Sequence, residues 1–269
     1  MTKSKDQIKR MRRAGRVVAE VHEKVAAAVR PGVTTRSLDR VSEDVLRARG
    51  AVSSFKGYHG FPATICTSPN AVIVHGIPDG YVLKEGDIIG IDAGAIVEGW
   101  HADAAFTIAV GDVSDEALRL MEVTEESLWA GLRQAVEGKR LSDIGHAVQS
   151  VAEAAGYGVV REYVGHGIGT AMHEEPQVQN YGPSGRGPRL RVGMVLAIEP
   201  MVNVGDYTTK VLDDGWTVVT RDGTLSAHYE HTVAVTDNGP EVLTLTEGEN
   251  PWALERGPQG WARRRLPVR

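Results

Sequence analysis

Cysteine is almost absent from this sequence, and several other features are missing as well. Its 269 residues include one cysteine, Cys66, so the chain cannot form a disulfide within itself, and we expect it in the reducing cytoplasm. No run of about 18 apolar residues is present, which predicts no membrane span. The 30 Lys and Arg residues do not outnumber the 35 Asp and Glu residues, and the net charge of −5 argues against DNA binding. Nothing in the composition indicates more than a monomer.

The remaining composition is that of a globular protein large enough to bury a core. Hydrophobic residues make up 42% of the chain and charged residues 24%. Apolar residues at helical spacing predict helices over 6–29, over 35–49 with Thr35 as N-cap, over 114–136, and over 142–155 with Ser142 as N-cap. Short apolar runs predict strands over 71–75, 158–163, 192–198, 216–220 and 228–235.

The segment 86–103, GDIIGIDAGAIVEGWHAD, has the pattern of a β-hairpin. Glu98 and Gly99 suit a two-residue turn, so residues 97 and 100 should pair and the pairs should continue outward. Asp103 then lies opposite Gly94, diagonal to Asp92 on the same face of the hairpin. Isoleucines before Asp92 indicate that this strand is buried. Two buried carboxylates that converge repel each other unless a cation lies between them.

The second half of the sequence repeats the order of the first. GDIIGID at 86–92 matches GMVLAIE at 193–199, and a His-x-x-Pro motif occurs in each half. Each half has the same order: two helices, a strand, the His-x-x-Pro motif, and then two strands that carry carboxylates. This repeated order predicts a duplicated α+β unit with a pseudo-two-fold axis. The matched pairs are Asp92 with Glu199, Asp103 with Glu230, and His75 with His173.

Four carboxylates that face one another across such an axis, together with His166, form a candidate metal site. Oxygen ligands with one imidazole suit Mn, Fe(II), Co or Zn better than a structural zinc, which favours thiolates. Four acids exceed the need of one divalent ion, so we expect two. Such ions lower the pKa of a bound water, and the predicted reaction is therefore a metal-assisted hydrolysis.

Two readings of the neighbouring residues remain open. The glycines of GHGIG (165–169) suit a phosphate-binding loop, or they let the backbone approach the metal edge so that His166 can turn inward. Cys66 is either a nucleophile or a small residue in a pocket wall. His75 and His173 could each donate a hydrogen bond to a substrate carbonyl from opposite sides of a cleft.

These residues carry a resemblance to the type I methionine aminopeptidases, which are M24-family enzymes of the pita-bread fold. The resemblance extends from about residue 6 to 246. It rests on the segments GYHGFP (57–62), VHGIPDG (74–80), IDAGAIVEGWHAD (91–103), GHGIGTAMHEEP (165–176), IEPMVN (198–203) and SAHYEHTVAVTDNG (226–239). It implies an α+β fold in which a curved antiparallel sheet is covered by helices.

The resemblance also implies roles for individual residues. Asp103 and Glu230 would bridge two metal ions and Glu199 would assist proton transfer, while His75 and His173 would contact the substrate. The family removes the initiator methionine from nascent polypeptides when the second residue is small. The metal ligands that it implies are Asp92, Asp103, His166, Glu199 and Glu230.

An apolar, adaptable pocket is needed to hold a methionine side chain. The resemblance places substrate-binding residues at Tyr58, Phe61, Cys66, His75, Met172, His173 and Trp216. The sequence departs from the family pattern at Phe55, where a smaller residue is frequent, at Met172, where an aromatic is common, and at His228, where glutamine is usual. Gly94 and Ala197 replace threonines that often support the metals. These departures concern pocket shape and the surroundings of the ligands.

Two regions are expected, a catalytic domain over 1–247 and an extended or disordered C-terminal tail over 248–269. The tail ends in basic residues beside tryptophan, which would suit a weak contact with ribosomal RNA. Two other functions fit the same fold: a peptidase for Xaa-Pro substrates and a non-catalytic binding protein. The short span between His173 and Glu199 and the lack of a large N-terminal domain favour the type I enzymes. All five ligands are kept, which argues against a non-catalytic relative.

Overall fold

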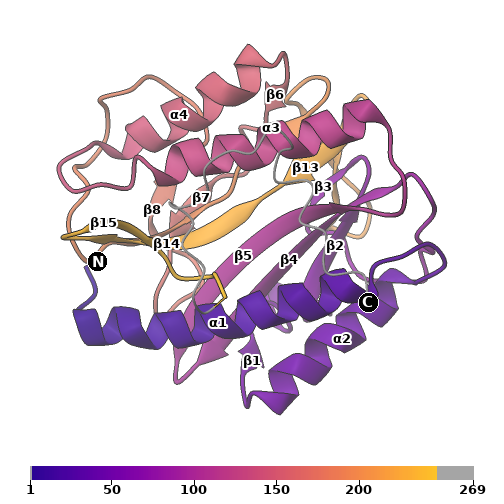
Figure 1. Cartoon of the computed structure of the whole chain (residues 1–269), viewed down its shortest axis with the longest axis horizontal. Coiled ribbons are helices and arrows are strands. Elements are labelled where there is room, and N and C mark those ends of the chain that lie inside the picture. The colour runs from indigo at the N-terminus through magenta and orange to yellow at the C-terminus, as the bar shows by residue number, and fades with distance from the viewer. Residues whose placement is uncertain (1, 247–269) are drawn as a thin grey trace.

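The structure is a computed structural model that describes residues 2–246. The expected domain boundary at 247 and the tail over 248–269 lie outside the described residues. Within that range no helix has both the length and the apolar composition needed to cross a membrane. Residues 2–246 form four long helices and fifteen strands, and Figure 1 shows how they are arranged.

A nine-stranded sheet in which all paired strands are antiparallel runs through the middle of the molecule. Its main path has the order β1-β4-β5-β14-β9-β7-β8, while β2 pairs with β4 and β15 pairs with β14. The long β4–β5 hairpin curves across the molecule in Figure 1. The strands are β1 (Val52–Ser53), β2 (Ile65–Pro69), β4 (Ile88–Val97), β5 (Trp100–Ala109), β7 (Gly165–Gly167), β8 (Glu174–Val178), β9 (Val195–Ile198), β14 (Glu230–Thr236) and β15 (Gly239–Val242).

Two small three-stranded sheets complete the strand structure. One has the order β13-β10-β6 and the other the order β11-β12-β3. A short 3-10 turn, Tyr58–Gly60, precedes β2. The strands of the small sheets are β3 (Val72–Val74), β6 (Gly158–Val159), β10 (Met201–Asn203), β11 (Thr209–Val211), β12 (Val218–Thr220) and β13 (Ser226–His228).

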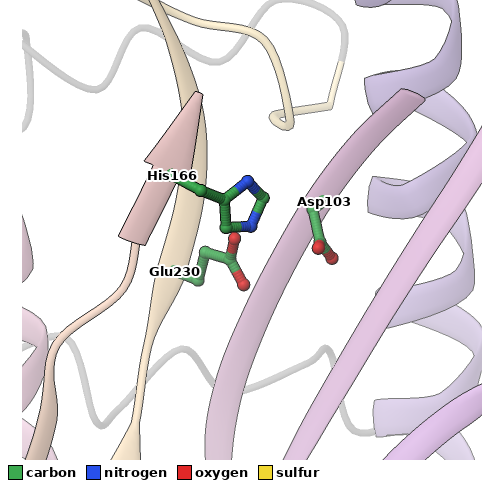
Figure 2. Close-up of side chains that lie close together, drawn as sticks. All are labelled: Asp103, His166 and Glu230. Carbon is green, nitrogen blue, oxygen red and sulfur yellow. The ribbon is translucent and has the colours of Figure 1, made fainter. Parts of the chain in front are cut away.

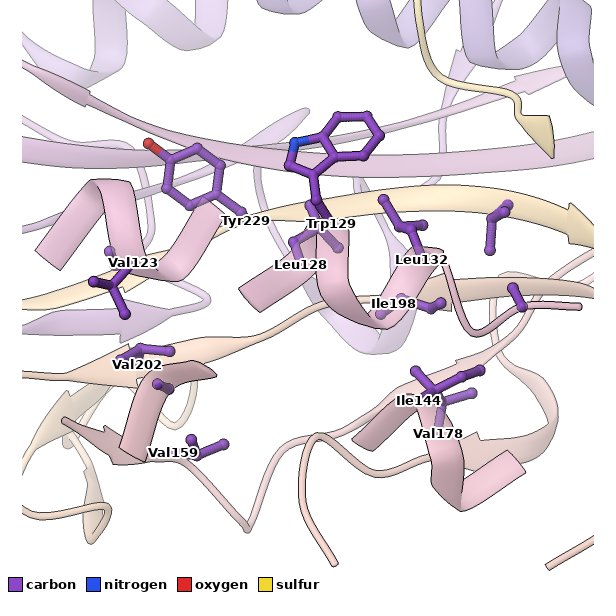
Figure 3. Close-up of a cluster of buried hydrophobic side chains, with 14 of the residues drawn as sticks. Val123, Leu128, Trp129, Leu132, Ile144, Val159, Val178, Ile198, Val202 and Tyr229 are labelled. Atoms are coloured by element: carbon purple, nitrogen blue, oxygen red, sulfur yellow. The ribbon is translucent and has the colours of Figure 1, made fainter. Parts of the chain in front are cut away.

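The four helices pack as two pairs, one on each half of the large sheet. Helices α1 (Lys5–Ala28) and α2 (Thr35–Ala48) share a core with β4 and β5. Helices α3 (Asp115–Leu132) and α4 (Leu141–Ala154) share another core with β9 and β14, and Figure 3 shows this cluster around Trp129 and Ile198. Burial of these apolar faces removes them from water and is the main contribution to stability.

Alternation along the hairpin sends one set of side chains to the helices and the other set to the opposite face. Ile89 and Ile91 of β4 and Ala104 of β5 belong to the core shared with α1 and α2. Because successive side chains of a strand point to opposite faces, Asp92 and Asp103 lie on the face away from these helices. The helix-covered face is therefore the core, and the other face carries the polar chemistry.

The register predicted for the hairpin is confirmed. Val97 pairs with Trp100 and Gly94 pairs with Asp103. The turn residues Glu98 and Gly99 have φ values of 51° and 78°. Two successive positive φ values are typical of a type I′ turn, whose twist matches that of the flanking strands.

The predicted duplication is also visible in the strand order. Strands β5 and β14 pair at the centre of the sheet, with β4 beside β5 and β9 beside β14. The hairpin strands of the first half thus have counterparts at equivalent places in the second half. Asp92 and Asp103 belong to one side of this centre, and Glu199 and Glu230 to the other.

Several element ends differ from the prediction. Thr34, rather than Thr35, is the N-cap of α2 and accepts a hydrogen bond from Ser37 N. Ser142 does not cap α4: Arg140 is at the N-cap, its N–H donates to the Asp143 carboxylate, and Ser142 Oγ accepts from Arg186 N instead. Helix α3 ends at Leu132, short of residue 136. Serine and threonine in adjacent positions all suit a cap, so sequence alone separates them poorly.

The predicted strands over 158–163 and 192–198 are shorter in the structure. The first stops at Val159, and the second begins at Val195 because Gly193 has a φ of 90° and cannot continue a strand. The segment 228–235 is divided at Tyr229, since β13 pairs with β10 whereas β14 pairs with β5 and β9. The chain therefore passes from one sheet to another at this residue.

Candidate metal centre and substrate cavity

A cavity of about 330 Å³ brings together every residue that the sequence analysis assigned to the site. A larger surface groove of about 650 Å³ lies near Arg140 and Arg189 and contains none of them. The predicted residues that line the cavity are Tyr58, Phe61, Cys66, His75, Asp92, Asp103, His166, Met172, His173, Glu199, Trp216 and Glu230.

Four of the predicted ligands lie on different strands of the large sheet, and the fifth directly follows a strand. Asp92 lies on β4, Asp103 on β5, His166 on β7 and Glu230 at the start of β14, whereas Glu199 directly follows β9. Asp103, His166 and Glu230 each offer one ligand atom such that these atoms all lie within 4.8 Å of one another. Figure 2 shows their side chains turned toward a common space between the three strands. Such a spacing suits a shared cation.

Glycines on either side of His166 allow its strand to approach its neighbours closely. A Cβ at Gly165 would lie 2.3 Å from Ala197 O, and one at Gly167 would lie 2.4 Å from Glu175 O. The segment is a strand and not a loop that opens a helix, so the phosphate-loop reading is wrong, and His166 turns into the cavity as the other reading expected. Glycine is required here because any side chain would separate the strands.

The hydrogen bond of His166 determines which of its ring nitrogens is free. Nδ1 lies 2.9 Å from Gly167 O, and a carbonyl oxygen can only accept. Nδ1 therefore carries the proton, and Nε2 keeps its lone pair toward the cavity, as a metal-binding imidazole requires. Nε2 lies 3.5 Å from Oε1 of Glu199.

Burial changes the pKa of every acid in the cluster. It raises the pKa of Asp92, Glu199 and Glu230 well above their usual values, and the neighbouring carboxylates raise them further. Burial also raises the pKa of Asp103 to about 7. Charged carboxylates this close repel one another in a medium that screens poorly, so the cluster retains protons unless a cation is present.

The unpaired oxygens of the cluster fit a cation. Oδ1 of Asp92, Oδ1 of Asp103 and Oε1 of Glu230 are buried and have no hydrogen-bond partner among the described residues. Unpaired buried acceptors are rare and costly in folded proteins. Divalent ions that prefer oxygen with one imidazole would satisfy these atoms and offset the repulsion. The residues present therefore suit the metal that the ligand pattern predicts.

His75 and His173 lie at the same cavity as predicted. His75 has a φ of 61°, an unusual backbone conformation for a residue other than glycine and one that clusters at functional sites. The Tyr58 hydroxyl lies 2.7 Å from Nδ1 of His173, and the rings of His166 and His173 are 4.2 Å apart. Burial lowers the pKa of His75 to about 4 and also lowers that of His173, so both rings are neutral at pH 7.

Apolar side chains form the wall of the cavity opposite the acids. Phe61 and Trp216 contact edge to face at 5.1 Å, and Met172 is buried beside them. Cys66 pairs with Asp92 across β2 and β4, and burial raises the pKa of its thiol. A thiol of raised pKa is a poor nucleophile, so Cys66 has the character of a pocket wall.

Two departures from the family pattern, Phe55 and Gly94, lie close together. A Cβ added to Gly94 would lie 2.9 Å from Cε1 of Phe55 and 2.7 Å from Cβ of Ser54. Phe55 is 4% exposed and belongs to the apolar wall of the cavity. The ring of Phe55 thus occupies the space that a larger residue at position 94 would need.

Some residues of the site were not predicted. Tyr163 and Val164 line the cavity directly before GHGIG, and the exposed His59 also lines it. Thr232 supports Asp103: its Oγ1 accepts from Asp103 N at 3.0 Å and donates to Asp103 O at 2.8 Å. Proximity in sequence to a metal-ligand motif could have indicated Tyr163, whereas Thr232 becomes recognisable only once β5 and β14 are paired.

Comparisons with known proteins agree with this geometry. The model of metallopeptidase family M24 matches residues 9–237. A methionine aminopeptidase of Clostridium acetobutylicum is 56% identical over 91% of this chain and 98% of its own length. The crystal structure of methionine aminopeptidase from Rickettsia prowazekii has a TM-score of 0.90 at 43% identity, over 91% of this chain and 99% of that one.

A more distant solved structure shares the fold alone. The prolidase from Pyrococcus furiosus has a TM-score of 0.74 at 22% identity, and the match covers 91% of this chain but 66% of the prolidase. The predicted pita-bread fold, with its curved antiparallel sheet and covering helices, is therefore confirmed.

Proposed function

The chain belongs to metallopeptidase family M24 and, within it, to the methionine aminopeptidases, and on this premise we propose how its residues perform the reaction. The protein is a metal-dependent aminopeptidase that hydrolyses the bond after an N-terminal methionine. The observation that carries this conclusion is the convergence of Asp103, His166 and Glu230 at an apolar cavity, in a chain 56% identical to a methionine aminopeptidase. The Xaa-Pro alternative is supported by fold similarity alone.

Asp92, Asp103, His166, Glu199 and Glu230 would hold two divalent ions, with Asp103 and Glu230 shared between them. Co, Mn, Fe(II) and Zn all suit this ligand set. When bound, the ions supply a water of lowered pKa and polarise the scissile carbonyl. Four carboxylates with raised pKa values and unpaired oxygens support two ions rather than one, because a single divalent charge would leave two negative charges uncompensated.

Glu199 would move the proton during hydrolysis. Its carboxylate lies at the cavity and contacts the neutral ring of His166 rather than a fixed cation of the protein. A carboxylate of raised pKa can take a proton from the attacking water and pass it to the leaving amine near neutral pH.

His75 and His173 would bind the substrate carbonyl by hydrogen bonds. Both rings are neutral, so each has one N–H to donate, and stabilisation of a developing negative oxygen needs donors rather than full charges. Tyr58 fixes the ring of His173 through the hydroxyl contact at 2.7 Å. The methionine side chain would pack against the apolar wall of the cavity, with Tyr58 at the edge of this wall. The wall is formed by Phe61, Cys66, Met172 and Trp216.

We expect the natural substrates to be nascent polypeptides whose second residue is small. The enzyme would act in the cytoplasm as a monomer, and its single buried cysteine supports the cytoplasmic location. A weak contact of the 248–269 tail with ribosomal RNA is part of this proposal and lies outside the described residues.

Release of methionine from Met-Ala-Ser by the purified protein with Mn or Co tests the activity. Met-Leu-Ser is the matched substrate for the second position, and we expect much slower cleavage of it. A Gly-Pro dipeptide serves for the Xaa-Pro alternative. Cleavage of Gly-Pro in preference to Met-Ala-Ser would contradict the assignment, and equal rates for Ala and Leu at the second position would contradict the preference for small residues.

A further inference from the structure

His228, at the end of β13, is a buried imidazole to which the mechanism above gives no role. Its side chain is 4% exposed, and its Nε2 atom has no hydrogen-bond partner among the described residues. Oε2 of Glu199 lies 4.0 Å from this Nε2. A buried polar atom without a partner is destabilising, so its persistence calls for a partner that it acquires in the working enzyme.

The backbone of His228 is fixed by a threonine of the neighbouring hairpin. His228 N donates to Thr107 Oγ1 at 3.0 Å, and the same hydroxyl donates to His228 O at 2.9 Å. On its other side His228 pairs with Met201 of β10. These contacts place the imidazole at a defined position beside the carboxylate of Glu199.

The two oxygens of Glu199 have different neighbours. Oε1 lies 3.5 Å from Nε2 of His166, which belongs to the ligand cluster, whereas Oε2 is directed toward His228. The backbone oxygen of Glu199 accepts from Asn180 Nδ2 at 3.0 Å, so the main chain is already held. The orientation of the carboxylate is left to the side chains around it.

We propose that His228 is a positioning residue for Glu199, whose Nε2–H donates to Oε2 and thereby keeps Oε1 turned toward the ligand cluster and the substrate. This inference rests on the proposed function for the role of Glu199. All five predicted ligands line the cavity, whereas His228 does not. His228 therefore acts through Glu199 and does not contact the substrate.

An imidazole suits this role because a ring N–H can donate a hydrogen bond to a carboxylate oxygen. Partners that orient a ligating or catalytic group typically affect metal affinity or activity by about 10–100-fold when removed.

Three variants separate positioning from a purely structural role. His228→Leu fills the site with an apolar side chain and removes the N–H donor. His228→Gln keeps a donor, because its side-chain amide N–H extends about as far from the backbone as the imidazole N–H. His22→Leu is the matched control, because Nε2 of His22 is also buried and has no hydrogen-bond partner among the described residues, but this ring packs against Phe106 between α1 and β5. Thermal melting establishes that each variant is folded at the assay temperature.

Two measurements are made on each protein. Calorimetric titration of the metal-free protein with Mn(II) gives affinity and stoichiometry without turnover, and the Mn-loaded protein is assayed on Met-Ala-Ser. For His228→Leu we expect kcat to fall by about 10–100-fold, KM to change by less than about 3-fold, and Mn(II) affinity to weaken by about 10-fold. His228→Gln should remain within about 3-fold of the original chain in all three, and His22→Leu should match it.

Each other result would overturn the inference. Unchanged kcat and Mn(II) affinity in His228→Leu would make the residue structural only. Equal losses in His228→Gln and His228→Leu would mean that the N–H donor is not what matters. A lower number of bound Mn(II) ions in His228→Leu would make His228 a ligand instead. If the original chain neither binds Mn(II) nor cleaves Met-Ala-Ser, the proposed function itself is wrong.

Discussion

Nε2 of His166 lies 3.5 Å from Oε1 of Glu199, yet the two groups do not form an ion pair at neutral pH. Burial lowers the pKa of His166 to about 4 and raises that of Glu199 well above its usual value. The contact therefore joins a neutral ring to a carboxyl group whose protonated form is favoured by burial and whose ionised form a cation would favour. This relationship makes proton release a signature of metal binding.

We predict that binding of Mn(II) to the metal-free protein releases protons at pH 7. Glu199, Asp92 and Glu230 must lose theirs to become ligands, so the apparent affinity should rise with pH between 6 and 8. Calorimetry in two buffers of different ionisation enthalpy measures the number of protons. An observed enthalpy that does not depend on the buffer would contradict the prediction.

Substitution of Glu230 should have opposite effects on the metal-free and the metal-bound protein. Glu230→Gln removes an acid whose ionised form is destabilised first by burial and then by the neighbouring carboxylates, so the free energy of unfolding of the metal-free protein should rise by on the order of 1–3 kcal/mol. The same variant should lose the stabilisation that Mn(II) gives, and peptidase activity with it. Urea unfolding with and without Mn(II) measures both. A variant that is less stable without metal would show that the acids do not repel as described.

The raised pKa of Asp103 should make the stability of the metal-free protein depend on pH. Its pKa is raised to about 7, so the unfolded chain gives up this proton at lower pH than the folded one. The contribution of Asp103 to the stability of the folded chain is fully present below pH 4 and is lost as pH rises through 7. Between pH 5 and pH 8 the free energy of unfolding of the original chain should therefore fall relative to that of Asp103→Asn. No change in that difference would contradict the burial of this charge.

His22 should make the opposite contribution in acid. Burial lowers its pKa to about 3, so between pH 6.5 and 3 the unfolded state binds a proton that the folded state does not. Stability from this group is full above pH 6.5 and falls as pH drops, by about 1.4 kcal/mol for each pH unit. His22→Leu should lose less stability from pH 6.5 to 4.5 than the original chain does, whereas the exposed His146→Leu should not differ. Parallel pH curves for all three would contradict the prediction.

Phe55 and Gly94 should show coupling in a double-mutant cycle. Gly94→Thr places a side chain against the Phe55 ring and should reduce the free energy of unfolding by about 1–3 kcal/mol. In a Phe55→Ala background the same substitution should cost at least about 0.5 kcal/mol less. Additive effects in urea unfolding would show that the two positions are independent.

The sequence predicted most where a pattern is local or repeated. The hairpin register follows from a turn of Glu98 and Gly99 and an alternating strand, both of which are short-range properties. The pairing of Asp92 with Glu199 and of Asp103 with Glu230 could be inferred because the duplicated order implies a symmetric arrangement. These four carboxylates line one cavity, together with the pocket residues that the family resemblance placed there.

What the sequence did not reveal depends on contacts between distant segments. Ser142 is as good a cap residue as any, but its hydroxyl is used by Arg186 N from another loop. The break at Tyr229 arises because the chain moves from one sheet to another, which no local pattern records. His228 appeared only as an unusual residue, and its relation to Glu199 required the paired strands β10 and β13 around it.

The most direct test is metal content together with peptidase activity in one matched pair of proteins. The original chain should bind two Mn(II) ions and release methionine from Met-Ala-Ser, while Asp103→Asn should bind Mn(II) at least about 10-fold more weakly and have almost no activity. Thermal melting of the metal-free forms shows that both are folded. Normal turnover by Asp103→Asn, or a folded original chain that neither binds Mn(II) nor cleaves the peptide, would contradict the central claim that these carboxylates form a catalytic metal centre.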